Sequence, residues 1–190
     1  AQVFKTVADP FVGKLNMVSI DWASENHFGL IITLDCGIKA NEKVEYAREK
    51  GIDMIICDHH LPEDELPKAV AVLDPKREDC HYPFDDLSGC GVGFKLVQAY
   101  SQRYDIPFES LIPLLDLLVV SIASDLVSVT DENRVLILGD FIFGKLTQVS
   151  SPRTLNNRRD IIFLTLIIIK VISHLGHRLI SPAHDLLIIL

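Results

Sequence analysis

The sequence predicts an α/β protein built on a parallel sheet with helices on both faces. Three apolar runs, rich in β-branched residues, have the length and composition of buried strands, at residues 29–35, 52–57 and 69–74. A helical pattern separates the first two runs, and two more helical patterns follow the third. Strands that are apolar throughout and are joined by helices are typical of a parallel sheet covered on both faces.

The first expected strand, GLIITLD, ends at Asp35. The segment that follows, ANEKVEYAREKG, has Ala40, Val44 and Ala47 at helical spacing and a natural stop at Gly51. This pattern predicts a strand, a helix on one face of the sheet, and then the chain's return to the second strand.

The second and third strands follow the same logic. IDMIIC is expected to be a buried strand and leads directly into Asp58-His59-His60. AVAVLD is expected to be the third strand and ends at Asp74, after a loop interrupted by Pro62 and Pro67. In parallel sheets ligands bind beyond the carboxyl ends of the strands, which is where these acids and histidines fall.

Two helices are expected after the third strand. The segment LSGCGVGFKLVQAYSQRY predicts three glycines followed by a helix whose core side includes Val92, Leu96 and Ala99. A second helix is expected to begin near Pro107 and to carry Asp116 and Asp125. Nine positions separate these two acids, so an unbroken helix would place them on opposite faces, and Asp116 is interpreted as structural.

The last part of the chain differs in character. Residues 1–149 are interpreted as a partial α/β domain, and residues 150–190 as a divergent apolar tail of uncertain fold, with a boundary in the polar stretch 150–160. The run IIFLTLIII at 161–169 is too short to cross a membrane, which needs about 20 apolar residues. His174 and His177 would share a helical face, but no third ligand joins them in a patterned segment.

Charge and cysteine content restrict the possible classes of function. A formal net charge of −8 argues against a broad nucleic-acid surface, although it permits a metal site that holds one phosphate. The cysteines at 36, 57, 80 and 90 include no C-x-x-C pair, which excludes a zinc ribbon and favours a reduced, cytoplasmic protein. The opening stretch AQVFKTVADPFVGK lacks the pattern of a signal peptide.

The strand-end residues are the candidates for chemistry. Histidine binds manganese, zinc or iron through a neutral ring nitrogen, so one histidine of the Asp58-His59-His60 triplet could bind metal while the next faces a substrate. Asp35 and Asp125 could supply carboxylates, and Asp58 could orient a histidine ring. Metal-assisted phosphoester chemistry is the reaction class that this set predicts.

Two further features leave alternatives open. Ser88-Gly89-Cys90-Gly91-Val92-Gly93 could cradle a phosphate at a helix N-terminus, or its glycines could serve the close packing of a turn. The pattern is not the G-x-G-x-x-G of dinucleotide-binding proteins. Asp74, followed by Pro75, is interpreted as closing the strand rather than binding metal.

These residues resemble a known family. The stretch LIITLDCGIKANEKVEYAREKGIDMIICDHH, the later AVLDPKREDCHYPFDDLSGCGVGFKLVQA and the segment LLDLLVVSIASDLVSVTDENRVL are similar to the RecJ branch of the DHH phosphoesterases, which are single-strand-specific 5′→3′ DNA exonucleases. The resemblance covers residues 19–144, about two-thirds of the chain.

The resemblance implies a role for each strand-end residue. Asp35 would be shared between two Mn²⁺ (possibly Mg²⁺) ions, His59 would bind metal directly, and Asp125 would complete the metal site. His60 would face the scissile phosphate, and Asp58 would orient a histidine ring without binding the metal itself. Single-stranded DNA is the implied substrate and DNA-repair proteins are the implied partners, in DNA repair and recombination.

One departure from the family limits the prediction. The family's first metal motif, Asp-x-Asp-x-Asp-Gly, is absent, and residues 1–18 contain only Asp9 as an acid. The chain is therefore interpreted as truncated at its N-terminus and as an impaired exonuclease fragment. The alternatives are another DHH phosphoesterase, such as a pyrophosphatase or oligonucleotide phosphatase, and a remnant without enzymatic activity.

Overall fold

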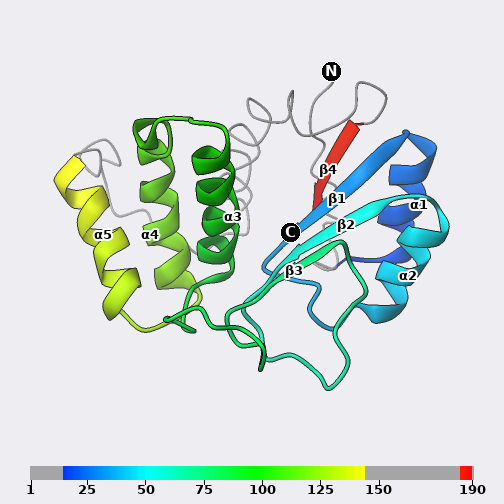
Figure 1. Ribbon diagram of the computed structural model, residues 1–190, viewed down its shortest axis with the longest axis horizontal. Coiled ribbons are helices and arrows are strands. Elements are labelled where there is room, and N and C mark those ends of the chain that lie inside the picture. Colours follow the sequence, from blue (N-terminus) through cyan, green and yellow to red (C-terminus); the bar gives the residue numbers. More distant parts are fainter. Residues whose placement is uncertain (1–14, 144–184, 190) are drawn as a thin grey trace.

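A parallel sheet lies between two groups of helices, as the sequence predicts (Figure 1). The computed structural model describes residues 15–143 and 185–189. The described strands run in the order β3-β2-β1-β4, and every neighbouring pair is parallel. Their bounds are Phe28–Leu34 for β1, Asp53–Cys57 for β2, Ala71–Leu73 for β3 and Asp185–Ile189 for β4.

The register of the strands brings their carboxyl ends to one edge. Leu34 of β1 lies beside Cys57 of β2, which in turn lies beside Leu73 of β3. The backbone N–H of Asp35 continues the ladder by donating to the Cys57 carbonyl at 2.9 Å, and that of Asp58 donates to the Leu73 carbonyl at 3.0 Å. The residues that follow the strands are therefore held side by side by backbone hydrogen bonds.

Helices α1 (Met17–Glu25) and α2 (Asn41–Glu49) cover one face of the sheet (Figure 1). Ile31, Met54 and Ile56 of the strands are buried against them. The sequence pattern predicts α2 but not α1. The start of α1 is fixed by a capping box in which the Ser19 N–H donates to the Asn16 side chain at 2.8 Å, a local signal that apolar periodicity does not carry.

Helix α3 (Gly89–Arg103) covers the other face, α4 (Leu115–Ser124) packs against α3, and α5 (Asp131–Phe143) packs against α4 (Figure 1). Ile32, Leu34 and Cys57 of the sheet are buried in this second core. Neighbouring residues of β1, such as Ile31 and Ile32, therefore belong to different cores. This alternation explains why the strands are apolar on both faces.

The expectation of one helix from Pro107 onward is wrong. Two 3₁₀ turns, η1 (Phe108–Ser110) and η2 (Ile112–Leu114), precede α4, which begins only at Leu115. Pro113 lies in η2, and a proline lacks the N–H that a continuous helix would require.

The glycines of SGCGVG also lie elsewhere than expected. They do not precede α3 but form its first turns, because Ser88 is the N-cap and its side chain accepts the Gly91 N–H at 3.1 Å. The prediction of which α3 residues face the core is also partly wrong. Val97 and Tyr100 are buried, whereas Ala99 is exposed.

The expectations for residues 144–184 lie outside the described residues, including the run 161–169 and the histidines at 174, 177 and 184. Strand β4 comes from the region interpreted as a tail, and it pairs with β1. Among the described helices, none is long and apolar enough to cross a membrane.

Candidate metal centre

Asp35, His59 and His60 meet beyond the carboxyl ends of β1 and β2. Each offers one possible ligand atom, and these atoms all lie within 4.8 Å of one another. The closest approach joins Asp35 Oδ1 and His59 Nε2, at 3.1 Å. The sequence-based expectation that these strand ends gather donor atoms is thus matched by the geometry.

Asp35 occupies an unusual backbone position directly after β1. Its φ of 63° lies in the left-handed region, and Gly37 follows with a φ of 112°. These two positive φ values show that the chain turns sharply directly after β1. The Asp35 side chain remains 45% exposed, which leaves it open to an ion or a substrate.

His59 is held in a fixed orientation by the backbone. Its Nδ1 lies 3.0 Å from the carbonyl oxygen of Leu87, which can only accept, so Nδ1 carries the proton. The lone pair of the neutral ring then lies on Nε2, which faces Asp35 and is 3.9 Å from Asp125 Oδ2. When the ring is protonated, its Nε2–H instead donates to the Asp35 carboxylate, and this hydrogen bond raises the pKa of His59, although burial acts in the opposite direction.

Asp58 anchors the turn that carries the two histidines. It is 1% exposed, and its Oδ2 accepts the Ile38 N–H at 2.9 Å. Its Oδ1 accepts the backbone N–H groups of His59, at 2.8 Å, and His60, at 3.2 Å. Burial alone would raise the pKa of Asp58, but the hydrogen bonds from Ile38 and His60 hold it below the usual value.

The ring of His60 is oriented by the same carboxylate. His60 Nδ1 lies 2.6 Å from Asp58 Oδ1, so Nδ1 donates and Nε2 is left for another partner. The ring is 57% exposed, unlike the buried ring of His59. Two adjacent histidines thus have different surroundings, as the sequence predicts for a metal ligand beside a substrate-facing group.

Asp125, the C-cap of α4, lies at the edge of this group rather than within it, with Oδ2 3.9 Å from His59 Nε2. Its Oδ2 accepts the Gly89 N–H at 3.0 Å and lies 3.4 Å from the Ser121 hydroxyl. Burial raises the pKa of Asp125, and the nearby negative charge of Asp35 raises it further. Asp116 lies in the first turn of the same helix and does not join the described cluster.

Gly89 is a site residue that the sequence analysis placed in a different role. A Cβ at this position would lie 2.1 Å from Asp35 Oδ1, a distance that real atoms do not adopt. Gly93, one turn later, would place its Cβ 2.8 Å from a methyl group of Leu34. The glycines therefore let α3 approach β1 closely (Figure 1), which favours close packing over a phosphate cradle.

A cleft of about 570 Å³ opens beside the cluster. Asp35 and His60 form part of its wall, and Lys39 and Lys43 line it from the start of α2. It is thus a space next to the donor atoms that two lysines also line, one of which, Lys39, pairs with Glu63 at 3.7 Å.

The donor set fits a divalent cation. Carboxylate oxygens of Asp35 and Asp125 and imidazole nitrogens of His59 and His60 suit manganese, zinc or iron. The negative charges of Asp35 and Asp125 repel each other, and a cation between the two carboxylates would offset this repulsion. The His59 tautomer set by the Leu87 carbonyl is the one that leaves Nε2 able to bind a metal.

Replacing Asp58 with alanine is expected to lower the free energy of unfolding by about 3 kcal/mol. Two buried N–H groups, those of Ile38 and His59, and the partly buried N–H of His60 would lose their acceptor. Urea denaturation measures the change. The control is Asp64→Ala, which removes an exposed acid of the following loop and should change stability by less than about 0.5 kcal/mol. Equal stability of the two variants would contradict this account of Asp58.

A parallel sheet with acids and histidines at its carboxyl edge defines an α/β domain of the kind that holds divalent metal ions. The chain belongs to the DHH family, because the model described as DHH family, N-terminal domain, matches residues 3–122.

Curated relatives are similar over the same region. The chain is 46% identical over 112 residues to the single-stranded-DNA-specific exonuclease RecJ of Bacillus subtilis (strain 168), covering 59% of this chain and 14% of that protein. It is 37% identical over 126 residues to the enzyme of the same name from Escherichia coli (strain K12), covering 62% of this chain and 22% of that protein. The resemblance predicted from the sequence is confirmed, over a small part of each relative.

Solved structures show the same relationship. An exonuclease RecJ bound to manganese matches with a TM-score of 0.58 and 27% identity, over 68% of this chain and 32% of that chain. RecJ from Thermus thermophilus in complex with Mn²⁺ matches with a TM-score of 0.55 and 26% identity, over 67% of this chain and 19% of that chain. The α/β fold of the described domain is therefore that of RecJ proteins.

Proposed function

We propose that this chain carries part of the catalytic core of a single-stranded-DNA exonuclease that hydrolyses phosphodiesters with the help of divalent metal. The observation that carries the proposal is the convergence of Asp35, His59 and His60, with Asp125 at 3.9 Å from His59, at the carboxyl edge of the sheet. The similarity to single-stranded-DNA-specific exonucleases supports the choice of substrate.

Asp35, His59 and Asp125 are the residues that would hold the metal, and manganese is the ion we favour over magnesium. Magnesium takes oxygen ligands in a near-ideal octahedron, so the imidazole nitrogen of His59 disfavours it. The manganese in two RecJ structures supports this choice. When bound, such an ion supplies Lewis acidity toward a phosphoryl oxygen and lowers the pKa of a coordinated water.

Other residues of the chain would contact the phosphates of the substrate. His60, whose ring is 57% exposed, would contact the scissile phosphate, while the buried Asp58 holds the ring in place through Nδ1. Lys39 and Lys43 in the adjacent cleft would attract the strand's phosphates. Hydrolysis adds water across a P–O bond, so that the hydroxyl joins phosphorus and the proton ends on the departing oxygen.

We further propose a cytoplasmic location and DNA-repair proteins as partners, in keeping with repair and recombination.

A second candidate is a phosphoesterase for small substrates, such as pyrophosphate or short oligonucleotides. The net charge of −8 favours it, because a long strand is normally bound by clustered cations. The substrate therefore has to be determined by direct comparison.

A manganese-dependent substrate panel tests the proposed function. We expect nucleotide release from a single-stranded oligonucleotide, little release from the duplex of the same sequence, and a loss of about a hundredfold or more in His60→Ala. His27→Ala is the control, because His27 is exposed and precedes β1 at the opposite end of the sheet.

The other outcomes of the panel are equally informative. Phosphate release from pyrophosphate without nucleotide release from DNA would favour the second candidate. The absence of any manganese-dependent product would contradict both and favour a remnant without activity.

A further inference from the structure

The carbonyl group that orients His59 belongs to a segment without regular secondary structure. Leu87 lies between β3 and α3, and its carbonyl oxygen is 3.0 Å from His59 Nδ1. Neither a helix nor a strand fixes the direction of this carbonyl. Its position therefore depends on what holds the residue before it, Asp86, and the residue after it, Ser88, which is the N-cap of α3.

Asp86 is held from the start of α5, the helix that lies beyond α4 from the sheet (Figure 1). Asn133, in α5, donates through Nδ2 to the Asp86 carbonyl at 2.8 Å and to the Ser128 carbonyl at 2.9 Å. The Ser128 N–H donates in turn to Asp86 Oδ2 at 2.8 Å. Both the backbone and the side chain of Asp86 are thus tied to the segment that leads into α5.

The chemistry of these contacts requires an amide at position 133. Asn133 is 0% exposed, and its Oδ1 is buried without a hydrogen-bond partner among the residues that the structure describes. Both groups that Nδ2 contacts are carbonyl oxygens, which only accept, so neither a carboxylate nor an apolar side chain could replace the two N–H donors. A buried acceptor without a partner is unfavourable, and the two donated hydrogen bonds are what the amide provides in return.

The neutral ring of His59 carries one proton and faces two acceptors. The Leu87 carbonyl oxygen lies 3.0 Å from Nδ1, and Asp35 Oδ1 lies 3.1 Å from Nε2. If the carbonyl moved away, the Asp35 carboxylate would draw the proton to Nε2, which would then have no lone pair for a metal ion. The position of the Leu87 carbonyl therefore decides whether the His59 ring can act as a ligand.

We propose that Asn133 is a positioning residue of the metal centre. By holding the Asp86 carbonyl, it keeps the next carbonyl, that of Leu87, against His59 Nδ1 and leaves Nε2 able to bind the ion. The proposal deepens the proposed function and rests on it, because it assumes that His59 binds metal. It extends the centre to α5, which contributes no donor atom to the described cluster.

Asn133→Leu tests the proposal, because leucine branches at the same carbon as asparagine but has no N–H donor. Nitrogen NMR shifts of the histidine rings, recorded on the whole chain without metal at a pH where the His59 ring is neutral, distinguish its two tautomers. We expect the Nδ1–H form to predominate in wild type and the Nε2–H form to gain share in the variant. Manganese affinity, measured by calorimetry, should fall about tenfold, as it does when a group that orients a metal ligand is removed.

Ile137→Ala is the control for a general loss of stability. Ile137 lies in the same helix, packs against the core beside α3, and has no group that could hydrogen-bond to Asp86. This variant should lower thermal stability but keep the wild-type tautomer and manganese affinity, at a temperature where both variants are folded. An equal change of tautomer in Ile137→Ala would overturn the proposal.

Asp86→Ala is an independent variant, which decides the matter if Asn133→Leu does not fold. It removes the acceptor of the Ser128 N–H from a partly exposed side chain and leaves Asn133 in place. The matched control is Asp85→Ala, which removes the same charge from the exposed neighbouring residue. We expect manganese binding to weaken about threefold, with a shift toward the Nε2–H tautomer, in Asp86→Ala alone.

An unchanged His59 tautomer in the folded variants would overturn the proposal. If wild type bound manganese while the tautomer stayed unchanged, only the role of Asn133 would fail. If wild type bound no manganese, the proposed metal centre would fail, and the comparison of tautomers, which is made without metal, would still decide whether Asn133 positions the His59 ring.

Discussion

Replacing Asp35 with alanine is expected to weaken manganese binding by about a hundredfold or more. Asp35 supplies the carboxylate oxygen nearest to His59 Nε2, at 3.1 Å, and it is the most exposed acid of the cluster. Removing a group that only orients a metal ligand typically costs about 10- to 100-fold in affinity, which the loss of a direct ligand should exceed. Isothermal titration with Mn²⁺ measures the change.

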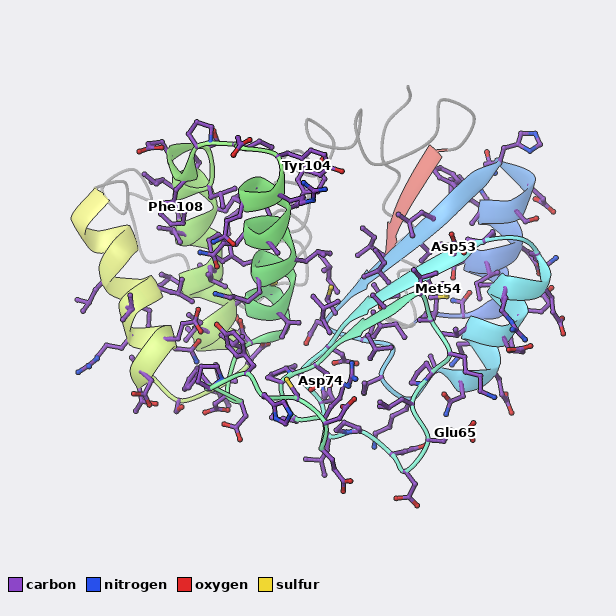
Figure 2. All side chains as sticks on the ribbon, viewed as in Figure 1. Asp53, Met54, Glu65, Asp74, Tyr104 and Phe108 are labelled. Carbon is purple, nitrogen blue, oxygen red and sulfur yellow. The ribbon has the colours of Figure 1, made fainter. Side chains whose placement is uncertain are left out.

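The matched control for Asp35→Ala is Asp53→Ala. Asp53 is an exposed acid at the first position of β2, at the end of the sheet remote from the cluster (Figure 2). This variant has the same change in charge and should bind manganese as wild type does. If Asp35→Ala and wild type had equal affinity, Asp35 would not be a ligand and the centre would have to be assigned elsewhere.

Replacing Gly89 with alanine is expected to disrupt the centre through packing alone. The new Cβ would lie 2.1 Å from Asp35 Oδ1 and 2.5 Å from Asp35 Cβ, so either α3 or Asp35 must move. Overpacking of this kind costs about 1–3 kcal/mol, and the movement should also separate Asp35 from Asp125, whose Oδ2 accepts the Gly89 N–H. We expect lower thermal stability together with loss of manganese affinity.

Gly139→Ala is the control for the glycine substitution. Gly139 lies in α5, and a Cβ there would meet Leu115 Cδ1 at 3.6 Å, an ordinary contact. Because alanine favours helix over glycine by about 1 kcal/mol, this variant should be as stable as wild type or more stable. A Gly89→Ala protein with unchanged stability and manganese affinity would show that α3 does not approach Asp35 as closely as described.

The strands and most residues of the cluster could be predicted from the local sequence alone. β1, β2 and β3 are short apolar runs with polar residues directly after them, and parallel register then forces Asp35 and Asp58 together. Asp125 was proposed as a carboxylate donor; it is an acid at a helix C-terminus, where a cation would be favoured, and it lies beside His59 and Gly89. Which of these residues bind metal remains a prediction.

Other features depend on contacts between distant segments and have no local signal. The glycines of α3 are needed because Asp35, far away in sequence, occupies the space a side chain would take at Gly89. The tautomer of His59 depends on a carbonyl 28 positions later, at Leu87. The break before α4 did have a signal, Pro113, which the apolar periodicity around it concealed.

The central claim is that the carboxyl edge of the sheet holds a divalent metal ion among Asp35, His59 and Asp125, with His60 beside it. A manganese titration of the wild-type chain, followed by paramagnetic broadening of the histidine ring signals in NMR, tests it most directly. We expect the signals of His59 and His60 to broaden first, at substoichiometric manganese, while that of His27 at the far end of β1 stays sharp. Uniform broadening of all histidines, or none at these two, would contradict the claim.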